Sequence, residues 1–206
     1  MKKTINFLLV GVGGQGTILA SDVLASVGRA AGYQAKKAEV HGMSQRGGSV
    51  TSHVRWGEAV YSPLVGAGEV DVLLAFEKLE ALRAVNQLRK GALALVNLET
   101  IEPITVSAGG QAYPGDTLLP SAFAQITPHV VQIDGPEIAS TLGNTKVANV
   151  VLLGALSALL EAGGLTGSEC PEALWLEVIA ERVPAKYLEL NRQAFLAGKE
   201  AVQNAG

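Results

Sequence analysis

Residues 5–16, INFLLVGVGGQG, decide the fold of this chain. The apolar run Ile5–Val10 predicts a buried strand, and it leads directly into the glycine-rich turn Gly11–Gly16. A helical pattern follows, so strand, turn and helix stand in the order of a nucleotide-binding β-α unit. Glycines let the backbone approach a diphosphate closely, and the free N–H groups at the start of the helix attract that anion. The alternative is a turn whose glycines serve only strand–helix packing.

The length and composition indicate one domain that contacts a partner. We expect a single domain over residues 1–206, because no repeat, low-complexity tract or linker divides the chain. Charged residues make up 17% of the sequence, below the usual value of about a quarter, which indicates that a partner buries part of the surface. The net charge is −3 and no Lys/Arg cluster is longer than a pair, which argues against binding to nucleic acid.

The cysteine content and the apolar segments indicate a cytoplasmic protein. Cys170 is the single cysteine, which excludes an intrachain disulfide, a Cys-x-x-Cys zinc site and an iron–sulfur cluster held by this chain alone. Met1-Lys2-Lys3 before an apolar run imitates a signal peptide, but Asn6 interrupts that run and glycines follow it. The apolar segment Val147–Leu160 is too short to span a bilayer and predicts a buried or interface helix.

Strand and helix patterns alternate along most of the chain and predict an α/β fold, a Rossmann-like three-layer arrangement with a mostly parallel sheet. After the first strand, further strands are expected over residues 33–40, 70–76, 92–98 and 129–134. The helices between them are expected over residues 14–32, 77–89 and 121–126, with another opened by Gly135-Pro136-Glu137.

Two further segments depart from this alternation. Polar and apolar residues alternate over 49–56, a turn follows at Gly57-Glu58, and the run 59–61 is again apolar, which predicts an inserted β-hairpin. The chain then ends in a helical segment, with helices expected over residues 145–162, 171–182 and 185–203.

The polar segment His41–Gly48 is a second candidate site, because open α/β sheets bind ligands beyond the carboxyl ends of their strands. Arg46, followed by Gly47 and Gly48, offers a guanidinium and backbone N–H groups to a phosphate or carboxylate. The alternative is a surface turn in which Arg46 pairs with a nearby carboxylate. His41 and His53 flank the segment without a third ligand, so we predict no metal site.

Glu39 keeps a dehydrogenase hypothesis open, because it stands about twenty residues after Gly16, where a dinucleotide enzyme binds the adenosine ribose. We interpret it instead as an exposed carboxylate at the end of a strand. No His–Asp or Tyr–Lys pair suggests a proton relay and no Ser-His-Asp or Cys-His arrangement is evident, so we assign no catalytic residue. Lys146 and Asn149 begin a long apolar helix, where they either contact a ligand or cap and solvate the helix end.

Four motifs stand in a fixed order along the chain: the turn over 11–16, Gly-Met-Ser-Gln-Arg-Gly-Gly over 42–48 with the hairpin after it, Asp-Val-Leu-Leu-Ala-Phe-Glu over 71–77, and Asn149-x-x-Leu-Leu-Gly-Ala155. Together they resemble the gamma-type domain of the 2-oxoacid:ferredoxin oxidoreductases over almost the full length. Within that family the resemblance is closest to the beta subunits of indolepyruvate ferredoxin oxidoreductases. It implies the oxidative decarboxylation of a 2-oxoacid to an acyl-CoA with reduction of ferredoxin.

The resemblance also implies that the chain is inactive alone. Thiamine diphosphate, magnesium and 4Fe-4S clusters are expected in a larger alpha subunit, because this chain has neither a cysteine series nor a Gly-Asp-Gly motif followed by an Asn pair. The resemblance assigns the coenzyme A diphosphate to Gly11, Gly13, Gly14, Gln15 and Gly16. It assigns substrate or phosphate at the subunit junction to Arg46, Gly47 and Gly48. An independent NAD-dependent dehydrogenase and a nucleotide-binding sensor are the competing hypotheses.

Overall fold

All six strands belong to one sheet. The computed structural model describes residues 3–41, 48–102, 112–115 and 117–203. In chain order the strands are β1 Ile5–Val12, β2 Gln34–His41, β3 Ser49–Gly57, β4 Val70–Ala75, β5 Leu88–Asn97 and β6 Val130–Ile133. Their order across the sheet is β2-β3-β1-β4-β5-β6, and only β3 runs against the others. The predicted mostly parallel sheet is confirmed.

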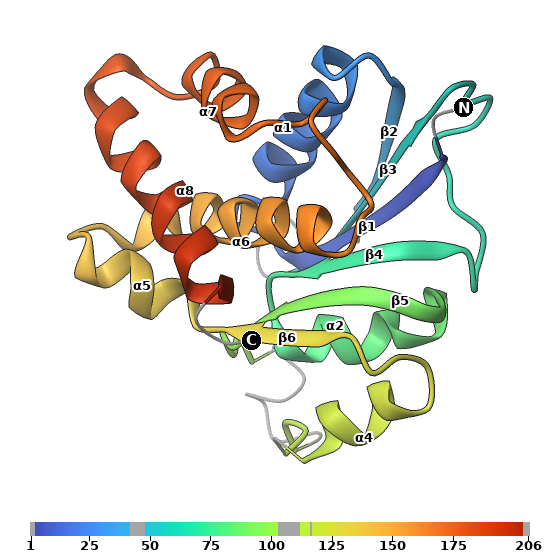
Figure 1. Ribbon diagram of the computed structural model, residues 1–206. Helices are drawn as coiled ribbons and strands as arrows, with labels where there is room; N and C mark the ends of the chain where they lie inside the picture. Colours follow the sequence, from blue (N-terminus) through green and yellow to red (C-terminus); the bar gives the residue numbers. More distant parts are fainter. Residues whose placement is uncertain (1–2, 42–47, 103–111, 116, 204–206) are drawn as a thin grey trace.

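Helices cover both faces of this sheet (Figure 1). One face carries α1 Thr17–Ala30, α5 Gly135–Thr141, α6 Ala148–Ala162, α7 Glu172–Ala180 and α8 Leu188–Gln203, whereas the other carries α2 Lys78–Ala84 and α4 Leu118–Ala124. Successive side chains of a strand point to opposite faces, and β1 accordingly divides between two cores. Phe7 and Leu9 pack with the first group of helices, and Leu8 and Val10 with the second. The predicted three-layer arrangement is confirmed.

The first strand of the predicted hairpin forms as β3, but the prediction of its partner strand is wrong. Residues 59–61 form no strand, and β3 instead pairs with β2 on one side and with β1 on the other. The ladder with β2 contains eight residue pairs, from Gln34–Gly57 to His41–Val50. A run of three residues offers far fewer backbone hydrogen bonds than that ladder, so the longer pairing prevails.

Helix α6 is a core helix, as predicted. The stretch Thr145–Ala162 has the length and apolar composition of a membrane span, but 72% of it is buried inside the protein. Figure 1 shows α6 packed between the sheet and α8. The two helices approach so closely that a Cβ on Gly154 would collide with the backbone carbonyl of Phe195, and one on Gly198 with that of Val151. Packing inside the protein therefore accounts for the apolar sequence of α6.

Candidate functional site

The glycine-rich turn connects β1 to α1 at the carboxyl edge of the parallel strands, as predicted. Gly16 is the N-cap of α1, and its φ of +80° lies in the left-handed region that favours glycine. A Cβ at this position would also collide with the side-chain amide of Asn149. Among the residues that the structure describes, no side chain caps the first turn of α1, so its N–H groups stay available at this edge.

Gln15 is held by the protein itself. Its Oε1 accepts a hydrogen bond from the Val12 N–H (2.7 Å), and its Nε2 donates to the Phe76 carbonyl (2.8 Å) and to the Glu99 carboxylate (2.9 Å). Phe76 directly follows β4, so this side chain fills the crevice between β1 and β4. Open α/β sheets bind ligands at such a crevice, where the chain winds off in both directions. Its backbone N–H also donates to the Val12 carbonyl (3.2 Å), so the hydrogen bonds of Gln15 shape the turn and leave ligand binding to its neighbours.

The glycine turn contacts Gly48, the last residue of the second segment predicted as a site. The Gly13 N–H donates to the Gly48 carbonyl (3.0 Å), because the antiparallel ladder of β1 and β3, which pairs Val12 with Ser49, continues one residue further. This bond uses the Gly13 N–H. Within the described ranges Gly14 and Gly16 donate no backbone hydrogen bond. Arg46 and Gly47 lie outside the described residues, and their predicted role stays a prediction.

A cleft of about 270 Å³ opens beside the glycine turn. Its walls come from the turn, the segment after β5, and the starts of α5 and α6: Gly13, Gly14, Gln15, Glu99, Ile101, Pro136, Thr145, Lys146, Ala148 and Asn149. The structure thus brings Lys146 and Asn149 to the turn from more than a hundred residues away. Asn144 caps the helix start by accepting from the Lys146 N–H (3.0 Å), so capping is not the task of the other two side chains.

The two charged side chains of this cleft, Lys146 and Glu99, differ in whether other residues engage them. The Lys146 ammonium is exposed and makes no hydrogen bond or ion pair with the part of the chain that the structure describes. The Glu99 carboxylate instead accepts hydrogen bonds from Gln15 and from the Asn97 amide (3.3 Å). The cleft therefore joins one unpaired cation to free N–H groups, which suits an anionic ligand.

Glu39 does not lie where a dinucleotide ribose needs a carboxylate. Strand β3 separates β2 from β1, which places Glu39 two strand spacings, roughly 10 Å, from the strand that carries the glycine turn. Its carboxylate pairs with Lys37 (2.5 Å), which also binds Asp22 of α1 (2.5 Å). Burial lowers the pKa of Lys37, but the two carboxylates outweigh it and raise that pKa above its ordinary value. Glu39 is therefore a half-buried carboxylate with a structural role. The dehydrogenase hypothesis no longer has an acidic residue that could bind the ribose.

Two buried acidic residues were missed by sequence reasoning. Glu77 is fully buried after β4, where its carboxylate accepts from the Glu80 N–H (2.9 Å), the Ile101 N–H (3.3 Å) and the Tyr113 hydroxyl. Burial, together with the neighbouring Glu77 carboxylate, raises the pKa of Tyr113. Glu80 accepts from the hydroxyl of Ser49 (2.6 Å), the first residue of β3. These bonds join the ends of three strands to α2. The sequence signal for Glu77 is a glutamate that stands between a buried strand and a helix.

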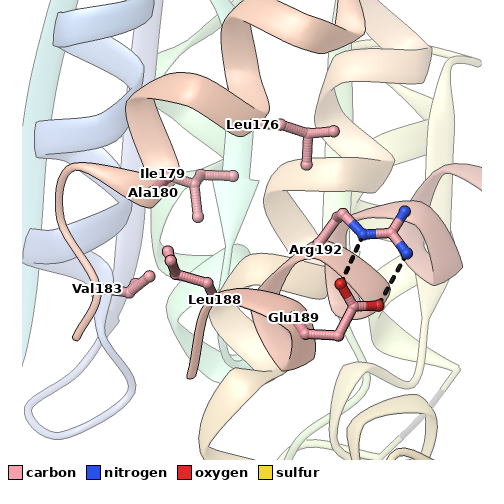
Figure 2. A pocket seen from close by; sticks show the side chains of 7 residues that line it. All are labelled: Leu176, Ile179, Ala180, Val183, Leu188, Glu189 and Arg192. Atoms are coloured by element: carbon pink, nitrogen blue, oxygen red, sulfur yellow. Dashed lines mark hydrogen bonds and ion pairs between the residues drawn. The ribbon is translucent and has the colours of Figure 1, made fainter. Parts of the chain in front are cut away.

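A second cavity, of about 160 Å³, lies between α7 and α8 (Figure 2). It is lined by the apolar side chains of Leu176, Ile179, Ala180, Val183 and Leu188. The guanidinium of Arg192 faces the carboxylate of Glu189 at its rim and donates two hydrogen bonds to it (2.9 and 2.8 Å). Because these two charges satisfy each other, the cavity offers an anion far less than the cleft beside the glycine turn.

Comparison with known proteins agrees with the motifs. The family model described as pyruvate ferredoxin/flavodoxin oxidoreductase matches residues 6–201. The chain belongs to this family. Two members of similar length are indolepyruvate oxidoreductase subunits IorB. The one from Thermococcus kodakarensis is 40% identical over 98% of this chain and 97% of its own length, and the one from Archaeoglobus fulgidus is 38% identical over 94% and 93%.

Solved structures in the family share the fold. The gamma subunit of a keto/oxoacid ferredoxin oxidoreductase from Geobacter sulfurreducens PCA superposes with a TM-score of 0.69 at 26% identity, over 97% of this chain and 99% of that one. A 2-oxoglutarate:ferredoxin oxidoreductase from Magnetococcus marinus has a TM-score of 0.73 at 21% identity, over 99% of this chain and 32% of that one. The resemblance to the gamma-type domain is therefore confirmed.

Proposed function

We propose that this chain is the small subunit of a 2-oxoacid:ferredoxin oxidoreductase that acts on indolepyruvate or a related aryl pyruvate. The complex converts the 2-oxoacid and coenzyme A into an acyl-CoA and carbon dioxide, and passes the electrons to ferredoxin. Similarity to the indolepyruvate oxidoreductase subunits along nearly the whole chain supports this function. The single-domain organisation over residues 1–206 and the cytoplasmic location stay predictions.

The redox cofactors belong, in this proposal, to the larger alpha subunit. A 4Fe-4S cluster takes four thiolates, and this chain has one cysteine, the half-buried Cys170. Among the described residues, no group of three or more His, Cys, Asp or Glu side chains is arranged to hold a metal ion. The residues present do not fit these groups, so we assign no step on thiamine diphosphate, magnesium or iron–sulfur clusters to this chain.

The cleft beside the glycine turn is our proposed site for the diphosphate of coenzyme A. The unpaired Lys146 ammonium, which lies in one cleft with the glycine turn, is the observation that carries this assignment. The N-terminus of the 14-residue helix α1 adds free N–H groups and the positive end of a helix dipole. The Magnetococcus marinus enzyme, which shares the fold, has coenzyme A bound in its structure.

Lys146→Gln tests the proposed coenzyme A site in the reconstituted complex. A partly exposed charge pair contributes up to about 1 kcal/mol, so the KM for coenzyme A should rise by about fivefold while kcat stays unchanged. Lys90→Gln is the matched control, because it removes the same charge from an exposed residue outside the cleft. An unchanged KM in Lys146→Gln, or the same rise in both variants, would refute the site without touching the subunit function.

Reconstitution tests the function itself. The chain should copurify with an alpha subunit that contains thiamine and iron–sulfur clusters, and indolepyruvate should reduce a viologen dye only when coenzyme A and both chains are present. Full activity of the isolated chain would contradict the subunit function. If the chain purified alone and bound NAD instead of coenzyme A, the dehydrogenase hypothesis would replace it. Faster turnover of pyruvate or 2-oxoglutarate would change the substrate and leave the subunit function intact.

A further inference from the structure

A cavity of about 540 Å³ opens at the amino edge of the parallel strands, the edge opposite the glycine turn. The starts of β4, β5 and β6 and the end of α6 enclose it. Its lining includes apolar side chains that pack in the core: Leu93, Val131, Leu159 and Leu165. Small-molecule sites typically have volumes of about 300–1,000 Å³ and combine an apolar lining with a few polar groups. This cavity has the size and the lining of such a site.

Three basic side chains, those of Lys3, Arg89 and His129, line the same cavity. Within the described part of the chain, the side chains of Lys3 and His129 make no hydrogen bond or ion pair. Arg89 directs its Nε to the Asp71 carboxylate and its Nη1 to the Lys90 carbonyl (3.2 Å), which leaves Nη2 without a partner there. Donors from three separate strand ends therefore remain available around one cavity.

The negative groups nearby do not cancel these donors. Asp71 is the acidic residue of the lining, and its nearly buried carboxylate is engaged by Arg89 and by the Asn6 N–H (2.8 Å). The C-terminus of α6 carries about half a negative charge, but the N–H groups of Gly163 and Gly164 cap its last carbonyls. With Asp71 balancing Arg89, the charge of Lys3 is left over in a chain whose net charge is −3. The cavity is therefore locally positive.

We propose that this cavity binds a small carboxylate with an apolar body. The carboxylate is held by Lys3, His129 and the free Nη2 of Arg89, and the apolar body lies on Leu93, Val131 and Leu159. The apolar lining excludes a fully hydrated anion such as phosphate as the preferred ligand, and the basic rim selects a carboxylate over an uncharged apolar molecule. This site does not depend on the proposed function of the chain.

Titration of indole-3-acetate into the full chain, followed by calorimetry and by amide NMR shifts at Gly91 and Gly163, tests the proposal. Indole-3-acetate should bind with a stoichiometry of one and shift both amides, whereas acetate and indole should each bind far more weakly. The double variant Lys3→Gln/His129→Gln should weaken binding by about tenfold, because the exposed Lys3 charge contributes up to about fivefold and the loss of the His129 hydrogen bond adds to it. Neither side chain forms a hydrogen bond or ion pair within the described residues, so the variant should fold, and urea unfolding checks this point.

Lys90→Gln is the matched control, since it removes one positive charge from the neighbour of Arg89 without altering the lining. It should bind indole-3-acetate like the wild type. Three results would overturn the proposal: no binding to the wild type, the same loss in Lys90→Gln as in the double variant, or shifts confined to residues away from this cavity.

Discussion

Gln15→Ala should lower the free energy of unfolding by about 3 kcal/mol. The substitution removes three hydrogen bonds of 2.7–2.9 Å, and a typical hydrogen bond contributes a net of about 1 kcal/mol. Phe76 and Glu99 each keep the Asn97 amide as a donor, so neither acceptor is left unsatisfied. The Val12 N–H is left without its acceptor, and an unsatisfied donor adds to the cost of the lost hydrogen bonds. The loss of about 3 kcal/mol is therefore a central value and not an upper bound.

Urea unfolding followed by circular dichroism measures this loss, provided that the slope m is unchanged. Gln132→Ala, at an exposed position of β6, is the matched control and should leave the midpoint where it is. Gln15→Glu keeps the acceptor for Val12 but places a second carboxylate beside Glu99. It should therefore be destabilised at neutral pH and recover partly in acid. If Gln15→Ala lowers the free energy of unfolding by less than about 0.5 kcal/mol, the Gln15 amide does not form these hydrogen bonds in solution. It would then be available to bind a ligand.

Two further predictions concern the core and the pH dependence. Gly154→Ala should lower the stability by about 1–3 kcal/mol in thermal unfolding, because the added Cβ forces α8 away from α6. Gly115→Ala is the control and should leave the stability unchanged, because its Cβ meets open space. Equal stability of the two variants would contradict the close approach of the helices. Burial lowers the pKa of His53, and its Nδ1 accepts a hydrogen bond from the Val65 N–H (3.3 Å). Below the ordinary pKa of 6.5, His53 therefore binds a proton more readily in the unfolded chain than in the folded chain. Stability should therefore fall as the pH drops from about 7 to 5.5, and His53→Gln should lose that part of the pH dependence; an identical slope in both proteins would show that His53 does not cause it.

The local pattern was sufficient for most of the fold. Buried runs such as Val70–Ala75 and the periodicity of α1 predict the elements in their correct order, and the glycines after β1 predict the tight turn that leads into α1. The prediction failed at the partner of β3. Alternation shows that a strand has one buried face, but it does not name the strand that lies beside it. The pattern favours pairing with the nearest apolar run, residues 59–61, whereas β3 forms the longer ladder with β2.

The candidate site divides in the same way. The tight turn at Gly14 and Gly16 could be predicted from sequence, because glycine tolerates the left-handed backbone conformations found there, and the ligand of these residues stays a prediction. The roles of Gln15, Glu39 and Lys146 could not. Whether such a group is available to a ligand depends on elements far along the chain. Gln15 is engaged by Glu99, β3 separates Glu39 from the glycine turn, and Lys146 lies in one cleft with that turn.

The sequence by itself determined the α/β class, the strand–turn–helix around the glycines and the burial of α6, because each depends on residues close to one another along the chain. The order β2-β3-β1 and the cleft that joins Lys146 to the turn were decided by the tertiary structure alone. Strand order sets which loops share an edge of the sheet, and that order follows from the total of backbone hydrogen bonds and buried area over the whole sheet. Because this total depends on many long-range contacts, no local sequence pattern predicts the strand order.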